Sequence, residues 1–486
     1  MSVFSNSVKS AIIDPVFTSS QRCEFRLANR GEAYLPTMRI GNLGLLKNAA
    51  QNQNHYHFGT GAASVINRIQ LLDGNEELDS LRNVSNWLTF KNSLHTNSQN
   101  DNVFNKLVGG EIGWATGATG ELLATDPKVI RETTTTTELG TLDLREVFPI
   151  LNNISHLSTT LFPNLRIVME YHTDPKALVS VQTPVAYSQV TKSIPILIVD
   201  EIVDEALIQS LDSQFMSASW VGIEHDQVQV PQVPGIVVTA TPADNALEQI
   251  QSVNLRVNGF QDKAVSRLMV SKVYQDLTEY VGTDTTGQLG VMNGLAQFGS
   301  RALHKEEFNM RVNGRMILAG RGVTTPAAST MLLADTWGEL NICPGQNIES
   351  VGIDSRYSLS QLNRQGNAND LPVGGTPCAN WVGSSLTNPR ILSGGGILNG
   401  AGTAYTAGNG PTAQQGHYTG NSAWYGLGVH DRVTDLQIQY QRTGNPSSAG
   451  GQSSSPGNYL PLNLHLFAEV SKRIDVSGGQ YKISYA

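Results

Sequence analysis

The sequence predicts an all-β fold, and two patterns support this prediction. Apolar side chains occupy every even position over residues 460–470, a period of two that places them on one face of a β-strand. The pattern turns through Gly478-Gly479 and resumes over residues 481–485, as expected for a hairpin. Asn-Gly pairs at 258–259 and 313–314 follow alternating segments, and both residue types tolerate the positive φ angles of hairpin turns. The chain therefore contains antiparallel strands.

Both halves of the chain contain further strand patterns. In the first half they cover residues 23–27, 37–43, 62–72, 165–171 and 194–199. In the second half they cover residues 253–257, 265–270, 308–312, 316–318 and 434–440. In the closing strand the even-numbered side chains should fill a core, while Asn463, His465 and Glu469 should face neighbours or solvent.

Two helices are expected between these strands. An acidic start at Asn75, Glu76 and Glu77 precedes apolar residues at helical spacing (Leu78, Leu81, Val84 and Leu88) through about residue 94. A second helical pattern covers residues 144–157, where the ring of Pro149 should kink or split it. Helices are too few for a doubly wound parallel sheet.

The length of the chain favours two domains. At 486 residues and 52.4 kDa it exceeds the size of one ordinary hydrophobic core. Prolines interrupt the strand pattern over residues 228–244 and indicate a connector. We expect a lead-in at 1–20, a first domain at 21–240 and a second at 241–486. Residues 363–428 are rich in glycine yet include aromatic side chains, so we predict one long folded insertion there.

The composition favours protein contacts over nucleic-acid binding. Only 15% of the residues are charged, against a usual fraction of about 25%. A surface of uncharged polar groups costs less to desolvate than a charged one. The net charge is −8 and Lys9 is the only basic residue among the first twenty, so we expect no direct binding of nucleic acid.

No segment indicates export or membrane insertion. The longest apolar run, residues 194–199, is far too short for a transmembrane span, and no signal-peptide core follows Met1. Cys23, Cys343 and Cys378 are widely spaced and predict reduced thiols, without a disulfide framework or zinc site. We therefore expect synthesis in a reducing compartment, where the glycosylation sequons at Asn83 and Asn153 carry little weight.

Several clusters have both a chemical and a structural interpretation, and the structural one is favoured for each. His55 and His57 could be a metal-binding pair or surface side chains, and the acidic run Asp200, Glu201, Asp204 and Glu205 could be a cation site or a solvated helix start. The glycines from Gly394 to Gly402 could form a phosphate-binding loop or a surface loop. The run Thr133 to Thr137 could be an edge strand or a loop that contacts a neighbour. The common hydrolase and metalloprotease motifs are absent. No catalytic, cofactor-binding or metal-binding residue is assigned, and no cofactor is expected.

Four segments together resemble the double jelly-roll major capsid proteins of icosahedral double-stranded DNA viruses, in the branch of polinton-like viruses, adintoviruses and virophages. They are Arg22 to Arg26 with the extended run to Leu43, Ala63 to Leu72 with the expected helix after it, Leu161 to Ile167, and Glu469 to Lys472 followed by Tyr481 to Tyr485. The likeness covers most of the chain as a pattern of strands and loops.

The resemblance implies two tandem eight-stranded jelly rolls, with the glycine-rich insertion in the second. It implies a structural protein without enzymatic activity, three copies of which form a pseudo-hexameric capsomer of a virion shell. The partners it implies are neighbouring capsomers, penton proteins and minor capsid proteins. Two alternatives remain: a carbohydrate-binding β-sandwich protein, with Trp381 and Trp424 stacking on sugars, and a β-sandwich enzyme that acts on polysaccharides with two carboxylates.

Overall fold

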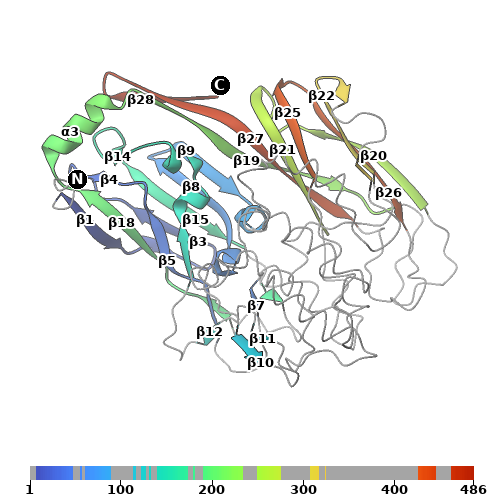
Figure 1. The fold of residues 1–486 in the computed structure, drawn as a ribbon, viewed down its shortest axis with the longest axis horizontal. Helices are drawn as coiled ribbons and strands as arrows, with labels where there is room; N and C mark the ends of the chain where they lie inside the picture. The colour runs from blue at the N-terminus through green and yellow to red at the C-terminus, as the bar shows by residue number, and fades with distance from the viewer. Residues whose placement is uncertain are drawn as a thin grey trace.

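A computed structural model describes the strands of both halves of the chain. The described residues are 7–47, 55–56, 61–88, 113–116, 122–126, 131–132, 140–172, 179–180, 190–233, 249–274, 307–316, 323–324, 425–444 and 461–485. Figure 1 shows two groups of sheets side by side, with the first half of the chain on the left and most of the second half on the right.

The first half forms two antiparallel sheets that face each other. One sheet contains, in spatial order, β1 (Val8–Ile13), β18 (Ile196–Ile202), β5 (Arg39–Leu43) and β13 (Gly140–Asp143). The other contains β3 (Arg22–Arg26), β15 (Leu165–Tyr171), β8 (Ile66–Asp73) and β9 (Glu76–Arg82). Short strands extend them: β2 (Phe17–Thr18), β4 (Ala33–Tyr34) and β14 (Leu157–Ser158).

The second half repeats this arrangement. One sheet contains β19 (Ser217–Val230), β27 (Leu462–Ser477), β21 (Lys263–Tyr274) and β25 (Tyr425–Val433), and β28 (Gln480–Tyr485) also pairs with β27. The other contains β20 (Gln249–Val257), β26 (Leu436–Gly444), β22 (Glu307–Val312) and β23 (Arg315–Met316), with β24 (Val323–Thr324) beside β22.

The two halves share one strand order. If the eight main strands of each half are counted along the chain, one sheet of each half has the order 1-8-3-6 and the other has the order 2-7-4-5. Two facing four-stranded sheets connected in this way form a jelly roll. The prediction of an all-β fold with two tandem jelly rolls is therefore confirmed by the strand pairings of the chain itself.

Smaller elements complete the described structure. They are the strands β6 (Leu45–Lys47), β7 (His55–Tyr56), β10 (Gly113–Thr116), β11 (Leu122–Asp126), β12 (Arg131–Glu132), β16 (Val179–Ser180) and β17 (Val190–Lys192), the 3-10 turns η2 (Gly61–Val65), η3 (Leu144–Glu146) and η4 (Pro149–Asn152), and the helix α3 (Glu205–Gln214). Residues 84–88 are also helical. Among the described helices, none has the length and apolar composition of a membrane span.

Each jelly roll encloses its own hydrophobic core. In β15 the side chains at 165, 167, 169 and 171 are buried, as the alternation predicts. In the second core the side chains at 308, 310 and 312 of β22 meet those at 436, 438 and 440 of β26. Burial of these apolar side chains supplies the main driving force for folding of each half.

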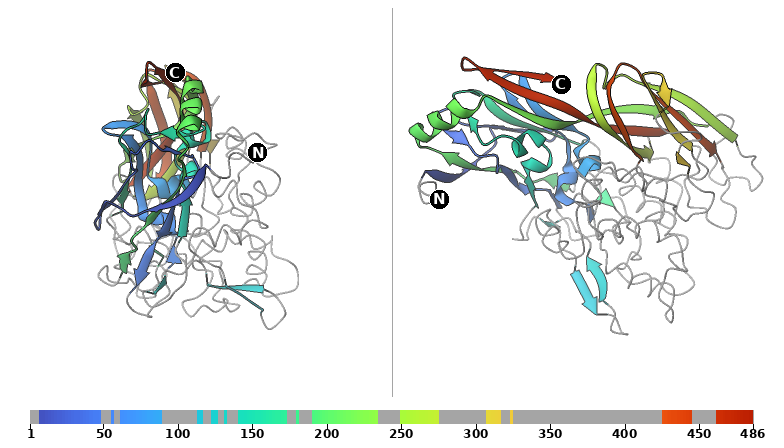
Figure 2. Two further views of the ribbon diagram at one scale, coloured as in Figure 1. Left: turned by 90° about the vertical axis from the view of Figure 1, so that its left-hand side faces the viewer. Right: turned by 45° about the horizontal axis from the view of Figure 1, so that its top comes forward.

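Two long strands of the second jelly roll also cover the first one. The even-numbered side chains from Leu462 to Val470 of β27 lie in the second core, as predicted, whereas Phe467 and Ile474 belong to the first. Trp220 and Ile223 of β19 also belong to the first core. Figure 2 shows β27 and β28 running over the first jelly roll. The closing hairpin therefore joins the halves, a role that the sequence did not predict.

The predicted helix from residue 75 is wrong over its first turns. Gly74 turns with a φ of +58°, and Glu76–Arg82 then forms β9, paired with β8. The register of this pair shifts at a bulge, so Leu78 and Leu81 are both buried although they are three residues apart. A bulge breaks the strand alternation and here imitates helical spacing.

One of the two predicted Asn-Gly hairpins is also wrong. Asn313-Gly314 does join β22 to β23, with φ angles of 49° and 81°. Asn258-Gly259, however, connects β20 to β21, which belong to different sheets. Gly259 is required by space, because a Cβ there would lie 2.7 Å from the Asp226 carboxyl group, which accepts a hydrogen bond from the Gly259 N–H.

Other sequence predictions agree with the structure. Gly478 and Gly479 turn with φ angles of 62° and 78° between β27 and β28, the positive values that a tight hairpin turn requires. The helical pattern at 144–157 becomes the two 3-10 turns η3 and η4, with Pro149 at the start of the second. The insertion predicted at 363–428 lies outside the described residues up to residue 424, and its last residues, from Tyr425, begin β25.

The dual role of β27 predicts a large loss of stability for Phe467→Ala. Phe467 is fully buried, and its ring lies 5.5 Å from that of Trp87 in the first half and 4.9 Å from that of His225. We expect the free energy of unfolding to fall by about 3–5 kcal/mol. Urea denaturation should show a single transition, shifted as a whole.

The matched control is Val221→Thr in β19, where the side chain is 42% exposed. It should change the free energy of unfolding by less than about 0.5 kcal/mol. Two separate transitions for Phe467→Ala, with only one of them shifted, would contradict a core shared between the jelly rolls.

Candidate functional site

The two jelly rolls meet along a contact that contains buried charged and polar groups. On one side lie β19 and β27, and on the other lie β9, η4 and residues 83–88. We call this contact the seam. It holds a charged cluster (Asp79, Glu224, Lys263 and Lys472) and a histidine cluster (His172, His225 and His465).

Asp79 is the most buried acidic group of the seam. The bulge in β9 turns its side chain inward, and its exposed fraction is 0%. One carboxyl oxygen accepts a hydrogen bond from the Ser80 N–H at 3.0 Å, and the other accepts one from the Ile150 N–H at 3.1 Å. Asp79 thereby satisfies a backbone donor at the start of η4 and fixes this turn against β9.

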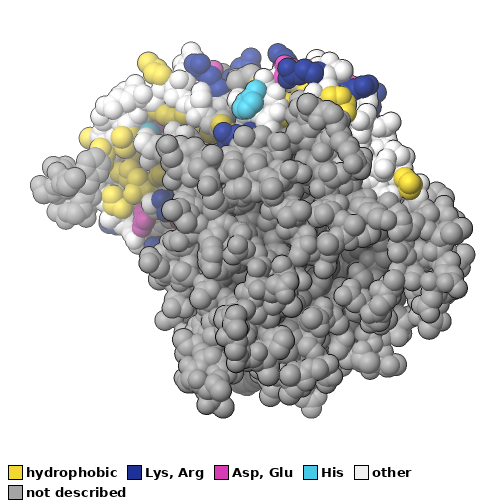
Figure 3. Space-filling model, turned by 45° about the vertical axis from the view of Figure 1, so that its right-hand side comes forward, with side chains coloured by type: hydrophobic (Ala, Val, Ile, Leu, Met, Phe, Trp, Pro, Cys, Tyr) yellow, Lys and Arg dark blue, Asp and Glu magenta, His cyan; other side chains and the backbone are white. Residues whose placement is uncertain are grey.

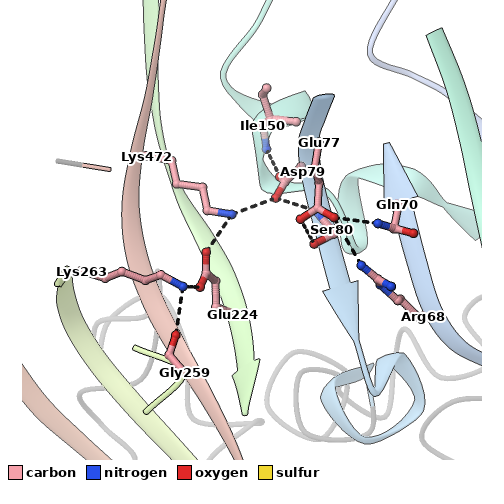
Figure 4. A network of polar contacts seen from close by, with 10 residues as sticks. All are labelled: Arg68, Gln70, Glu77, Asp79, Ser80, Ile150, Glu224, Gly259, Lys263 and Lys472. Atoms are coloured by element: carbon pink, nitrogen blue, oxygen red, sulfur yellow. Dashed lines mark hydrogen bonds and ion pairs between the residues drawn. The ribbon is translucent and has the colours of Figure 1, made fainter. Parts of the chain in front are cut away.

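Lys472 connects the two jelly rolls electrostatically. Its Nζ lies 3.9 Å from Asp79 Oδ1 in the first jelly roll and 3.2 Å from Glu224 Oε1 in β19 (Figure 4). Lys263 of β21 also contacts Glu224 and donates to the Gly259 carbonyl at 3.0 Å. Gly222 leaves room for the Lys472 side chain, since a Cβ at position 222 would lie 2.8 Å from it.

Burial and pairing act in opposite directions on these groups. Burial raises the pKa of Asp79 to about 6, although the Lys472 charge and two N–H groups favour its ionised form. Burial alone would lower the pKa of Lys472, but Asp79 and Glu224 together raise it. Burial would likewise raise the pKa of Glu224, yet Lys472 and Lys263 lower it overall. At neutral pH the cluster is therefore a network of paired charges.

The charged cluster is built to hold the jelly rolls together. Two carboxyl groups with pKa values shifted in opposite directions are also what a glycosidase uses. Here, however, Asp79 has no exposed surface, and Lys472 is only 5% exposed. A substrate therefore cannot reach Asp79 in this conformation, and the arrangement supplies a buried ion pair between domains.

The histidine cluster lies further along the same contact. His465 Nδ1 in β27 lies 2.9 Å from Asn83 Nδ2 and 3.1 Å from His225 Nε2 in β19. The two histidine rings stack with their centroids 5.3 Å apart. His172, directly after β15, places Nε2 2.9 Å from Ser85 Oγ.

All three rings are neutral at pH 7. Burial and, as a smaller effect, the charge of Lys192 lower the pKa of His172 to about 4. Burial and, as a smaller effect, the charge of Arg82 lower the pKa of His225 to about 4. Burial, together with the other two rings, lowers the pKa of His465 well below its usual value. Since Asn83 can only donate from Nδ2, His465 Nδ1 accepts that hydrogen bond.

The clusters considered from the sequence have structural roles where they are described. Asp204 caps α3 by accepting from the N–H groups of Ala206 and Leu207, so the acidic run is a helix start. Asp200 accepts from Ser10 and Thr37 and ties β1 to β18. His57, Thr133 to Thr137 and Gly394 to Gly402 lie outside the described residues. Within the described ranges, no three His, Cys, Asp or Glu side chains are placed to hold a metal ion.

Other expectations concern single residues. Cys23 is a buried free thiol whose pKa burial raises to about 11, and Cys343 and Cys378 lie outside the described residues. His465 faces the neighbouring jelly roll, as predicted. Glu469 does not face solvent: it is 5% exposed and accepts a hydrogen bond from Ser266 at 2.9 Å.

The sequence contains one signal for the charged cluster that the predictions did not use. Lys472 continues the apolar phase of β27, after Val470 and before Ile474. A lysine at an inward-facing position of a buried strand requires a buried partner. The bulge hides the matching signal at Asp79, because it disrupts the alternation in β9.

A scan against protein-family models finds no match, and a search of curated proteins finds none. Several solved structures similar to this chain come from viruses. PBCV-1 VP54, fitted into a reconstruction of the virophage Sputnik, has 9% identity and a TM-score of 0.49, over 99% of this chain and 97% of that one. The Sputnik virophage structure has 10% identity and a TM-score of 0.47, over 98% and 88%. The mavirus major capsid protein has 10% identity and a TM-score of 0.42, over 99% and 90%.

These structures are of the kind that the sequence resembles. Identities this low concern the fold alone, and the TM-scores lie below 0.5. We therefore base the function on the strand order, contacts and charges of this chain.

Removal of the lysine charge should disrupt the seam. In Lys472→Met the carboxyl groups of Asp79 and Glu224 lose a buried cation, and we expect the free energy of unfolding at pH 7 to fall by about 3–5 kcal/mol. The measurement is urea denaturation followed by circular dichroism.

Arg473→Met is the matched control in the next position of β27. Arg473 pairs with Asp475 at the surface, with exposed fractions of 51% and 48%, so the loss should stay under about 1 kcal/mol. Equal losses for the two variants would mean that the buried network does not stabilise the seam.

Proposed function

We propose that this protein is a viral major capsid protein, a structural component of an icosahedral shell. The observation that supports the proposal best is the strand order 1-8-3-6 and 2-7-4-5, which occurs in both halves of the chain. Jelly rolls of eight strands are typical of viral capsid proteins and of lectins. Two of them joined side by side agree with the capsid family that the sequence resembles.

Three copies form a pseudo-hexameric capsomer in this proposal. Each chain contributes two jelly rolls of similar topology, so a cyclic trimer presents six β-sandwiches around its axis. A cyclic trimer uses one pair of unlike surfaces three times and closes without leaving a free edge. The seam supports this role, because it holds the two jelly rolls of one chain at a defined angle.

The surface of the chain suits such an assembly. Only 15% of the residues are charged, and the described part of the face in Figure 3 combines uncharged groups with basic side chains along one edge and apolar ones at one side. Ile12 and Ile194 are 67% and 63% exposed in or beside the sheet of β1 and β18, and Val16 is 60% exposed. Neighbouring capsomers, penton proteins and minor capsid proteins are the proposed partners of such surfaces.

We assign no enzymatic activity and no cofactor to the chain. The carboxyl groups with opposite pKa shifts lie in the buried seam. The net charge of −8 supports a shell protein that does not bind the genome directly. In this proposal the protein is made inside the host cell and resides in the virion. The predicted domain bounds of 21–240 and 241–486 shift with the strand pairing. Val8–Ile13, inside the predicted lead-in at 1–20, pairs with β18 of the first jelly roll, and Ser217–Val230 pairs with β27 of the second.

The oligomeric state tests the proposal. Purified protein should have the mass of a trimer in multi-angle light scattering, and negative-stain class averages should show six lobes around a central axis. Six lobes are expected because two similar β-sandwiches per chain are repeated three times.

The alternative functions predict other results. A monomer in light scattering would refute the capsid proposal. Binding of a glycan array by that monomer would favour the carbohydrate-binding alternative, and hydrolysis of a polysaccharide, lost on replacement of one carboxylate, would favour the enzyme.

A further inference from the structure

The histidine cluster has a feature that the shell proposal does not use: three neutral, partly buried rings lie at the contact between two domains. His465 comes from β27, His225 from β19 and His172 from the end of β15. Across the same contact, Trp87 packs on Phe467, and Ser271 Oγ of β21 donates to Asn86 Oδ1 at 3.1 Å. Separation of the two jelly rolls would expose all of these groups to water.

We propose that the histidine cluster makes the seam acid-sensitive: protonation of its rings weakens the contact of β19 and β27 with the first jelly roll. This inference concerns the single chain, and it holds whether or not the chain forms a capsid.

The hydrogen bonds of His465 leave no place for an added proton on its Nδ1. His465 Nδ1 accepts a hydrogen bond from Asn83 Nδ2, and His225 Nε2 also lies 3.1 Å from His465 Nδ1. A proton on His465 Nδ1 would meet two donors. Stacking at 5.3 Å also brings two positive rings together once both are charged.

Within the described part of the chain, neither His225 nor His465 contacts an acidic side chain that could compensate a positive ring. Charged side chains are described on each of the surrounding strands. They are Glu76, Glu77, Asp79 and Arg82 of β9, Arg166 and Glu170 of β15, Lys192 of β17, Glu224 and Asp226 of β19, Lys263 and Arg267 of β21, and Glu469, Lys472, Arg473 and Asp475 of β27. Asp79 accepts from the Ser80 and Ile150 N–H groups, Glu224 contacts Lys263 and Lys472, Asp226 accepts from the Gly259 N–H, and Glu469 accepts from Ser266. Glu77 accepts from Gln70 and Ser80, Glu170 lies 3.8 Å from Arg68, and Asp475 pairs with Arg473. The charges that act on the rings are those of Arg82, Lys192 and the rings themselves.

The direction of the pH effect follows from the pKa values. Folding lowers the pKa of His172 and His225 from 6.5 to about 4, so the opened state takes up protons first as the pH falls. Stability that is present above pH 6.5 is then lost between pH 6.5 and about 4. When the pH falls from 7 to 5, each of these two histidines raises the equilibrium constant for opening of the seam by about 20-fold.

Asp79 acts in the opposite direction but is outweighed. Folding raises the pKa of Asp79 from 3.8 to about 6, so the folded state binds this proton more tightly than the unfolded state. Acid therefore stabilises the folded state through Asp79. When the pH falls from 7 to 5, protonation of Asp79 lowers the equilibrium constant for opening of the seam by about tenfold. Three histidines against one aspartate leave a net loss of stability in acid.

Two substitutions remove the titration and keep the hydrogen-bonding atoms. Asn at position 465 places an acceptor oxygen near the site of Nδ1, and Gln at position 225 places a donor nitrogen near the site of Nε2. His430→Asn is the control, since His430 is exposed on β25 and has a φ of 49°, which Asn tolerates.

The test is urea denaturation of the full chain at pH 7 and pH 5. For His225→Gln, the increase of the unfolding constant between the two pH values should be about 20-fold smaller than for wild type and for His430→Asn. For His465→Asn the increase should also be smaller than for wild type and for His430→Asn. An increase equal to that of wild type in both variants would overturn the proposal.

A second measurement reports on the seam if those variants do not fold. Ser271 is fully buried at the seam, so a thiol in Ser271→Cys is protected while the seam is closed. Labelling with 4,4′-dithiodipyridine, quantified by mass spectrometry at position 271 and normalised to unfolded protein at each pH, should be at least tenfold faster at pH 5 than at pH 7. Equal normalised rates would overturn the proposal as well.

Discussion

The structure depends on the sharing of β19 and β27 between two hydrophobic cores. The same strand pair closes one sheet of the second jelly roll and covers the first, with Leu466 in one core and Phe467 in the other. Adjacent residues of a strand point to opposite faces, so a strand that is buried on both faces can serve two domains at once. The two jelly rolls are therefore joined by a continuous β-ribbon as well as by a linker.

This sharing explains the buried charges. Where β27 leaves the second core it must still cover the first, and Lys472 occupies the position where one core ends and the other begins. A buried ion pair adds little stability compared with an apolar contact of the same size. It does, however, disfavour a shifted position of β27 against the first jelly roll, because the shift would leave Asp79 buried without its cation. The cluster thus specifies the register in which the two jelly rolls meet.

The sequence predicted the strands better than the way they are connected. Alternation identified β15, β22, β26 and β27, because each has one face in a core. It failed at β9, where a bulge imitates helical spacing, and at Asn258-Gly259, where the turn crosses between sheets. The seam could not be predicted, since Asp79, Glu224 and Lys472 are far apart in the chain and nothing local indicates which strands will meet.

Hydrogen exchange measured by mass spectrometry tests the shared ribbon most directly. If β19 and β27 form one continuous ribbon over both cores, peptides from residues 217–224 and 470–477 should be as strongly protected at pH 7 as peptides from residues 225–230 and 462–469. Rapid exchange of residues 217–224 and 470–477, with protection only of the parts within the second jelly roll, would contradict the account.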